Sequence, residues 1–401
     1  MDKKSPIEIF SVFLRLGLTS VGGPVAHLGY FREEFVNRKK WLSDQAYADL
    51  VALCRTLPGP ASSQVGLGIG LAKGGFLGGA AAWTGFTLPS ALLLTLFGYG
   101  VLEAGSTLGG GWLTGLKVVA AAVVVQALWG MARSMCLDGL RATIALLSAI
   151  VALNLAGPMG QIAAILGGAI LYSALTRSKE AIGDPGALNV TLPLPIAIFS
   201  LVLFAILLAG LPFVAAATGD PVLTAFDAFY RAGALVFGGG HVVLPLLQSE
   251  LVDPGWVSGD NFLAGYGAAQ AVPGPLFTFA AYLGTVLEGG ISGWQGAFIC
   301  LFAIFAPSFL LMIGILPFWS RLRQIPALGP ALNGINAAVV GLLLAAFIGL
   351  IAPVAIATPV TTGIALLAFA ALQFWKLPPW LIVIAAAITG FGLEQAGLLT
   401  A

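Results

Sequence analysis

The segment "TLPGP" at residues 56–60 interrupts a chain that is otherwise apolar and compatible with helix. A second cluster of the same kind, "VPGP" at 272–275, lies in a similar setting in the other half of the chain. Proline removes a backbone donor and clashes with the preceding helical turn, so each cluster predicts a broken helix. Any fold proposed for the chain has to explain why this break occurs twice.

The composition is that of an integral membrane protein. Of the 401 residues, 59% are hydrophobic and only 9% are charged, and the mean hydropathy is +0.98. Soluble proteins of this length carry far more charge. The net charge of +1 and the lack of a basic tract give no indication of nucleic-acid binding. The three cysteines lack metal-ligand spacing, and we expect neither a metal nor a cofactor.

Apolar runs predict an all-α polytopic protein. Helices need about 20 residues to cross a bilayer, and runs of about this length lie at 80–102, 112–132, 196–218, 296–318, 331–352 and 354–372. Two shorter runs, 142–156 and 161–176, predict a tight helical hairpin, and a last run begins at Trp380. The runs do not alternate polar with apolar residues, which excludes a transmembrane β-barrel.

The two halves of the chain match each other, which indicates an internal duplication. At a constant offset of 216 residues, "FLRLG" (13–17) aligns with "FYRAG" (229–233), "GGP" (22–24) with "GGG" (238–240), and "EFV" (34–36) with "ELV" (250–252). One residue is then lost, and "LPGP" (57–60) aligns with "VPGP" (272–275); further on, "LPS" (88–90) aligns with "APS" (306–308). We expect a first repeat in 1–176, a connecting segment in 177–221 with one extra span at 196–218, and a second repeat in 222–401.

The charges of the loops predict that the two repeats have inverted topology. Lysine and arginine favour the cytoplasmic side of a membrane. The segment 32–40 holds four basic residues, whereas its counterpart 250–260 holds only acidic ones. The turn at 133–141 holds Arg133 and Arg141, whereas its counterpart near Pro353 is uncharged. Conversely, the turn at 103–111 has no basic residue, whereas its counterpart holds Arg321 and Arg323. Inverted repeats with broken or re-entrant helices are typical of secondary transporters, and the extra span at 196–218 would reverse the direction of the chain.

The breaks themselves predict an anion site near the pseudo-two-fold axis. A helix that starts at a break has free N–H groups and a partial positive charge, and such ends hold anions. The predicted site lies between four breaks, made of Gly22, Gly23 and Pro24; Pro58, Gly59 and Pro60; Gly238, Gly239 and Gly240; and Pro273, Gly274 and Pro275. The alternative is that each Pro-Gly-Pro cluster is only a kink where helices pack.

Side chains near the breaks complete the predicted site. Arg15 and Arg231 occupy equivalent positions, seven residues before the first glycine of a break. A charged residue inside a membrane usually has a partner or a task, although a basic side chain can also snorkel to the headgroups. The remaining candidates are polar or basic residues close to a break or within an apolar run: Arg55, Ser62, Lys117 and Gln270, with His27 and His241 as candidates for a proton-linked role or a purely structural one.

Four longer motifs resemble the chromate ion transporter family. They are "GGPVAHLGYFREEFV" and "ADLVALCRTLPGP" in the first half, and "FGGGHVVLPLL" and "GYGAAQAVPGPLFTFAAYLG" in the second. Because both halves match, the chain resembles the long, two-domain form of that family. The resemblance implies export of chromate and resistance to it, with sulfate as a related oxyanion. It also implies that the protein is located in the inner membrane of a prokaryote. The second half has Gly240 where the first has Pro24, so we expect two sites that are not equivalent.

Other functions are weighed against this expectation. The sequence contains no H-E-x-x-H, G-x-S-x-G or Walker motif, which argues against an enzyme and a primary pump. A passive oxyanion channel stays an alternative, because broken helices that face an anion would serve a channel equally well. The expected partners are the oxyanion and the lipid bilayer, and the sequence leaves open whether the chain forms a homodimer.

Overall fold

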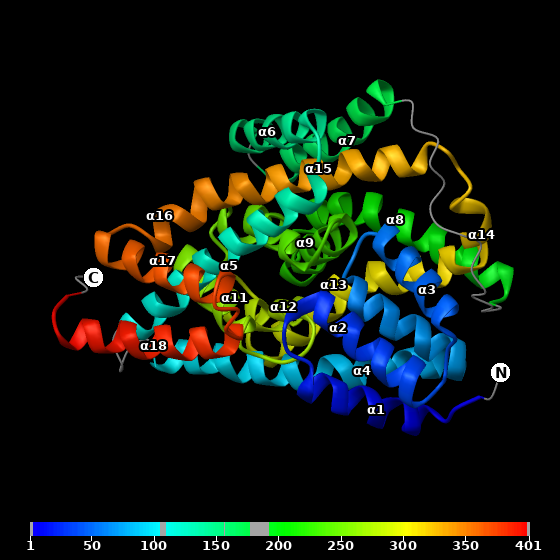
Figure 1. Ribbon diagram of the computed structural model, residues 1–401, viewed down its shortest axis with the longest axis horizontal. Helices are drawn as coiled ribbons and strands as arrows, with labels where there is room; N and C mark the ends of the chain where they lie inside the picture. The colour runs from blue at the N-terminus through cyan, green and yellow to red at the C-terminus, as the bar shows by residue number, and fades with distance from the viewer. Residues whose placement is uncertain (1–2, 105–109, 156, 177–191, 399–401) are drawn as a thin grey trace.

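The computed structural model describes residues 3–104, 110–155, 157–176 and 192–398, and this part of the chain is built from helices without any β-strand (Figure 1). Six of its helices are long and apolar enough to cross a membrane. They are α4 (Ala61–Ala104), α5 (Gly111–Met135), α7 (Pro158–Leu175), α8 (Leu194–Thr218), α13 (Gly293–Ile315) and α15 (Leu328–Ala346), the last two extended by short helical segments. The all-α polytopic prediction is confirmed.

The first repeat begins with short helices that end at the predicted breaks. Helix α1 (Pro6–Thr19) is followed by the glycine break, by α2 (Gly23–Arg32) with its π-helical continuation η1 (Glu33–Arg38), and by α3 (Asp44–Thr56). The Pro-Gly-Pro break then leads into α4. Helix α5 and the hairpin of α6 (Gly139–Asn154) and α7 complete the repeat, close to the predicted runs.

Helix α4 is a helical hairpin and not one continuous span. Its chain reverses at Gly75, where φ is +61° and ψ is −152°. A Cβ on Gly70 would collide with the backbone of Gly78, so the two sides of the reversal pack backbone against backbone. The short arm therefore covers 61–74, and the long arm, 76–104, is the part that can span a membrane.

The second repeat follows the same plan in shorter pieces. It contains α9 (Pro221–Leu235), η2 (Gly240–Val242), α10 (Val243–Leu247), η3 (Gln248–Val252), α11 (Gly259–Ala269), η4 (Leu276–Thr278), α12 (Phe279–Val286), α13, η5 (Leu316–Phe318), α14 (Trp319–Leu322), α15, η6 (Phe347–Ile351), α16 (Ala352–Ala355), α17 (Pro359–Gln373) and α18 (Pro379–Gln395). Helices α12 and α13 correspond to the two arms of α4, with a loop in place of the reversal at Gly75.

The two repeats start at opposite ends of the molecule. Lys4 donates a hydrogen bond to the carbonyl of Lys73, so α1 starts beside the reversal of α4; we call this the Lys4 end. At the other end of the long arm, Tyr99 accepts a hydrogen bond from the N–H of Trp294. Gly290, in the loop before Trp294, lies against Pro221 at the start of α9; we call this the Trp294 end. The repeats are therefore inverted, and Figure 1 shows the two termini at opposite ends.

Helix α8 carries the chain from one end to the other. Near its start, Ala197 and Leu201 lie against Gly314 at the end of α13. Helix α13 runs antiparallel to the long arm of α4, so this part of α13 lies at the Lys4 end. Helix α8 ends at Thr218, just before α9 begins at the Trp294 end. Helix α8 coincides with the apolar run at 196–218, is long and apolar enough to cross a membrane, and brings the chain to the opposite end before the second repeat starts.

Each repeat packs its last hairpin against a long helix of the other. Helices α6 and α7 pack on α15, whereas α17 and α18 pack on α5. Glycine permits two of these contacts at backbone distance, Gly341 against Ala145 and Gly115 against Ala386. The largest buried apolar cluster accordingly contains residues of both repeats. Neither repeat forms a separate unit, and the sites between them are fixed by both.

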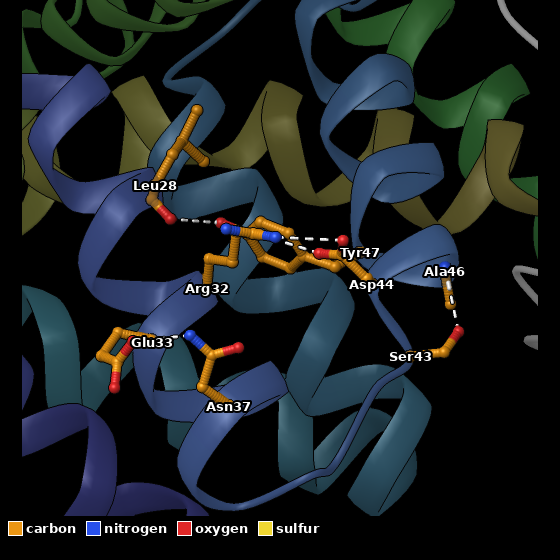
Figure 2. A network of polar contacts seen from close by, with 8 residues as sticks. All are labelled: Leu28, Arg32, Glu33, Asn37, Ser43, Asp44, Ala46 and Tyr47. Atoms are coloured by element: carbon orange, nitrogen blue, oxygen red, sulfur yellow. Dashed lines mark hydrogen bonds and ion pairs between the residues drawn. The ribbon is translucent and has the colours of Figure 1, made fainter.

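A polar network holds the loop between α2 and α3 at the Lys4 end (Figure 2). Arg32 donates hydrogen bonds to both carboxylate oxygens of Asp44, at 2.8 and 3.0 Å. Ser43 caps α3 by accepting from the N–H of Ala46, and the Tyr47 hydroxyl donates to the carbonyl of Leu28 at 2.6 Å. The hydrogen bond and charge of Arg32 lower the pKa of Asp44 below its usual value. These contacts fix how the polypeptide turns back toward the first Pro-Gly-Pro break.

Candidate functional site

Each Pro-Gly-Pro break donates one backbone hydrogen bond to the opposite repeat, so the two repeats are joined by a reciprocal pair. The N–H of Gly59 donates to the carbonyl of Val236 at 2.7 Å, and the N–H of Gly274 donates to the carbonyl of Ser20 at 3.0 Å. Gly59 is equivalent to Gly274 in the repeat alignment, and Ser20 is equivalent to Val236. Each repeat thus supplies the acceptor for the break of the other, around a pseudo-two-fold axis. We call the contact at Gly59 the first crossing and the contact at Gly274 the second crossing.

Both crossings require glycine for the same two reasons. The backbone φ is +117° at Gly59 and +105° at Gly274, which strains any residue with a side chain. The space is also occupied: a Cβ on Gly274 would lie 2.7 Å from Oγ of Ser90, and one on Gly59 would overlap Ser308. Ser90 and Ser308 belong to the aligned "LPS" and "APS" motifs. The serine of each repeat therefore packs on the break of the other repeat.

A cavity of about 250 Å³ opens beside the second crossing. Its wall comes from both repeats: the first glycine break, one face of α5, the segment around the second Pro-Gly-Pro break, and the tip of the α17–α18 hairpin. The lining residues are Gly22, Gly23, Pro24, Val123, Gln126, Ala127, His241, Ala269, Gln270, Val272, Gly274, Leu276 and Pro379. Since one water takes up about 30 Å³, the cavity has room for a small polyatomic ion.

Two helices begin at the wall of this cavity. Helix α2 starts at Gly23, after Gly22 in a left-handed conformation with φ +109°, and α18 starts at Pro379. The first N–H groups of a helix have no partner within the helix, and their partial charge is positive. Neither Lys nor Arg is among the residues that line the cavity. Pro378 and Pro379 have no N–H, so the free backbone donors at the wall come from the start of α2, and α18 adds only the positive end of its dipole. An anion would therefore be held there by these helix ends and by neutral polar groups.

Three polar side chains face this space. His241 shares a hydrogen bond of 2.6 Å between its Nδ1 and the Tyr266 hydroxyl. Gln126 donates through Nε2 to the carbonyl of Leu372, and Gln270 makes a longer contact of 3.4 Å to the carbonyl of Tyr266. The paired amide of Gln126 and the paired imidazole of His241 are held in place. Gln270 is the least constrained of the three and can turn toward a bound ion.

The structure brings together part of the predicted site. Gly22, Gly23, Pro24, His241, Gln270 and Gly274 all line the cavity. Pro273 and Pro275 flank Gly274, and Gly240 lies against Pro24, so Gly238, Gly239 and Gly240 bring the second glycine break next to the first. Four predicted residues of the first Pro-Gly-Pro segment lie at or next to the first crossing and outside the cavity wall: Pro58, Gly59, Pro60 and Ser62. His27 is also outside the cavity wall, and its ring packs on Phe86.

The predicted basic residues are placed elsewhere, and three of them have acidic partners. Arg15 pairs with Glu34 at 2.6 Å, and the equivalent Arg231 pairs with Glu250 at 2.8 Å. Arg231 also pairs with Asp227, and Lys117 pairs with Asp260. Arg55 is exposed at the end of α3. None of the four basic residues lines the cavity, so their direct contact with an anion stays a prediction.

Sequence reasoning missed some of these partners for different reasons. Glu34 and Glu250 are the first residues of the aligned "EFV" and "ELV" motifs, so their equivalence as partners of the arginines could have been found. Gln126 and Pro379 carry no such signal. They reach the cavity from helices that are far from the breaks in the sequence.

Comparison with known proteins agrees with this arrangement in two halves. The sequence model described as "Chromate transporter" matches residues 7–173 and again 223–391. The chain belongs to the chromate transporter family. The family match repeats once per half, as expected for two homologous repeats.

Several chromate transporter relatives cover nearly the whole chain. A "Chromate transport protein" of Pseudomonas aeruginosa is 30% identical over 395 residues, which is 96% of this chain and 91% of that protein. A protein of the same name from Cupriavidus metallidurans is 27% identical over 392 residues, 96% of this chain and 92% of that protein. An "Uncharacterized transporter" of Bacillus subtilis is 36% identical over 172 residues, 41% of this chain and 93% of its own length. No solved structure matches the chain significantly.

Proposed function

We propose that this protein is a secondary transporter that exports chromate across the cytoplasmic membrane and thereby confers resistance to chromate. The family match and the full-length relatives named for chromate transport support the substrate. The six candidate spans support a multi-pass membrane location. The observation that carries the proposal is the cavity beside the second crossing, where the broken helices of both repeats meet.

The chemistry of the cavity suits a tetrahedral dianion. Chromate has four oxygens that accept hydrogen bonds, and the start of α2 offers the N–H groups of Gly22 and Gly23 in a fixed arrangement. Helix α18 begins with two prolines that have no N–H, so it contributes mainly the positive end of its dipole. The amides of Gln126 and Gln270 can add neutral donors. Sulfate has the same shape and charge, so we propose that it competes with chromate or is carried with it. Helix ends and amides recognise shape and charge, and they offer little to tell the two oxyanions apart.

Electrostatic asymmetry between the two ends favours export. At the Lys4 end, Glu34 pairs with both Arg15 and Arg38, and an open pocket of about 390 Å³ is lined by these residues and Lys39. At the Trp294 end, the equivalent Arg231 pairs with two carboxylates, those of Asp227 and Glu250. The same ion pair thus lies in a net positive setting at one end and a net negative setting at the other.

The positive-inside rule assigns the Lys4 end to the cytoplasm. A dianion would then be attracted to the cytoplasmic mouth and repelled from the outer one after release. One charge that crosses 100 mV changes free energy by about 2.3 kcal/mol, so a dianion that leaves a negative-inside cell gains roughly twice that. Export needs no coupling ion on this account, and a proton-linked role of His27 or His241 would be an addition to it.

Chromate uptake by inside-out membrane vesicles tests the proposal. Vesicles that contain the protein should accumulate chromate when their interior is made positive, with a rate that saturates with chromate concentration. Excess sulfate should reduce the rate, and excess chloride should leave it unchanged. Uptake no faster than that of vesicles without the protein would refute chromate export. A rate that rises linearly with concentration, without counterflow, would indicate a passive channel.

A further inference from the structure

Unpaired polar groups are buried at the first crossing. Near Gly59, the side-chain atoms Ser63 Oγ (on the first turn of α4), Gln64 Oε1 and Ser308 Oγ have no hydrogen-bond partner among the described residues. The three residues are 4%, 1% and 2% exposed, respectively. Buried polar groups without partners are costly, and native proteins keep few of them.

The equivalent positions at the second crossing are paired or apolar. The repeat alignment places Thr278 opposite Ser63, and the Thr278 hydroxyl donates to the carbonyl of Pro275 at 2.7 Å. Phe279 replaces Gln64. Ser90, which corresponds to Ser308, donates to the carbonyl of Thr87 at 3.1 Å. The second crossing has unpaired groups at other positions, Ser20 Oγ and both ring nitrogens of His27. The set formed by Ser63, Gln64 and Ser308 is therefore particular to the first crossing and is not repeated at the equivalent positions.

In the repeat alignment, the residues of the first crossing correspond to residues that line the cavity beside the second crossing. The cavity wall contains Gly274 and Gln270 of the second repeat, and their equivalents are Gly59 and Arg55. In this structure the space next to Gly59 is filled by Ser308 and the amide of Gln64. The molecule thus has one open and one closed version of the same arrangement. Inverted repeats allow the two versions to exchange, because each repeat can adopt the conformation of the other.

We propose that the first crossing is a second oxyanion-binding position, which opens when the cavity at the second crossing closes. Ser63 and Ser308 would then donate their hydroxyls to the oxyanion. Gln64, whose Nε2 now donates to the carbonyl of Pro58 at 2.6 Å, would turn its amide to the same ligand. This inference rests on the proposed transport function and deepens it, since it names the residues that receive the ion in the opposite-facing state. The unpaired groups are explained because they are built for a state in which a ligand satisfies them.

A double variant, Ser63→Ala with Ser308→Ala, separates this role from a structural one. In the present state the two substitutions remove unpaired hydroxyls, so the midpoint of thermal unfolding should stay the same or rise. Chromate uptake by vesicles should nevertheless fall at least tenfold. Thr285→Val is the matched control, because its buried hydroxyl is paired with the carbonyl of Ala281 and lies away from both crossings; uptake should be unchanged. Wild-type uptake by the folded double variant would overturn the proposal.

Cysteine labelling provides the second measurement. In a variant with Cys54, Cys136 and Cys300 replaced by alanine, Ser63→Cys and Ala127→Cys report on the first crossing and on the cavity. A membrane-impermeant thiol reagent should reach them from opposite sides of the membrane, and conditions that raise one rate should lower the other. Chromate should slow both reactions. Ser308→Cys serves as an alternative reporter should Ser63→Cys fail to fold.

The outcomes separate this inference from the proposed function. If the wild-type protein takes up no chromate, the proposed function itself fails. If uptake is normal but Ser63→Cys and Ser308→Cys stay unreactive from both sides during turnover, only the second position is refuted. If they react but chromate gives no protection, the first crossing holds water and not the oxyanion, which also refutes it.

Discussion

Substitution of Gly274 by alanine tests the crossing geometry with the smallest possible side chain. Gly274 has φ +105°, and its N–H makes the hydrogen bond to Ser20 that joins the repeats. An alanine Cβ would lie 2.7 Å from Oγ of Ser90 and 3.4 Å from the carbonyl oxygen of Phe86. The methyl group therefore strains the backbone and collides with its neighbour at the same time.

The expected free-energy cost of Gly274→Ala is the sum of the backbone strain and the steric overlap. A residue other than glycine in this region of φ costs about 1–3 kcal/mol. Added volume in a packed site costs about 1–3 kcal/mol more. The total of roughly 2–6 kcal/mol lowers the equilibrium ratio of molecules with the crossing intact to those without it by tenfold or more, because each 1.4 kcal/mol is about a factor of ten. We expect Gly274→Ala to lower the unfolding midpoint and to reduce chromate uptake at least tenfold.

The assay combines chromate uptake by vesicles with thermal unfolding of the purified protein. Gly167→Ala is the matched control, because this glycine is helical, has no positive φ, and has nothing within 4 Å of an added Cβ. A second substitution, Ser90→Gly, removes the colliding hydroxyl but leaves the backbone strain, so Gly274→Ala with Ser90→Gly should recover part of the lost stability. If Gly274→Ala and Gly167→Ala both transport at the wild-type rate, the reasoning about the crossing is wrong.

Three further predictions concern charge and topology. A single cysteine at Lys40 should be labelled from the cytoplasm and one at Asp253 from outside; labelling of both from one side would contradict the inverted arrangement. Arg15→Lys and Arg231→Lys should change chromate uptake less than twofold if these side chains act through their ion pairs, whereas a tenfold loss would place a guanidinium on the oxyanion. The pKa of Asp44 lies below its usual 3.8 in the folded protein, so its ion pair stabilises the fold above this pH and ceases to do so as the pH falls through the lowered value. The difference in unfolding midpoint between the wild type and Asp44→Asn should accordingly shrink from about pH 6 to pH 3, and a constant difference would contradict the assignment.

The helices and the inversion could be predicted because each depends on a property that the sequence carries directly. Runs of apolar residues define the spans, and the alignment of the two halves combined with the loop charges defines their opposite directions. The reversal at Gly75 was not predicted, since a glycine within an apolar region does not reveal a φ of +61°. The contact of Gly70 with Gly78 shows afterwards that backbone packing holds the two arms together.

The candidate site could be predicted only where the breaks themselves form it. Gly22 and Gly274 could be proposed because helix breaks are visible in the sequence, and both line the cavity. Gln126 and Pro379 were not found, because their place in the cavity depends on how the α17–α18 hairpin packs on α5. The role of Arg15 and Arg231 was inferred from charge alone, and the structure adds the carboxylates that charge could not reveal.

Protection of the cavity by chromate tests the central claim most directly. Ala127→Cys, in the variant without native cysteines, places one thiol in the cavity wall, and Lys40→Cys places one in an exposed loop as a control. The rate of reaction with a small polar thiol reagent would be measured at increasing chromate concentration. We predict that chromate and sulfate slow the reaction of Ala127→Cys in a saturable manner and leave Lys40→Cys unchanged. Equal rates at Ala127→Cys with and without chromate, in protein that still transports, would contradict a binding site between the breaks.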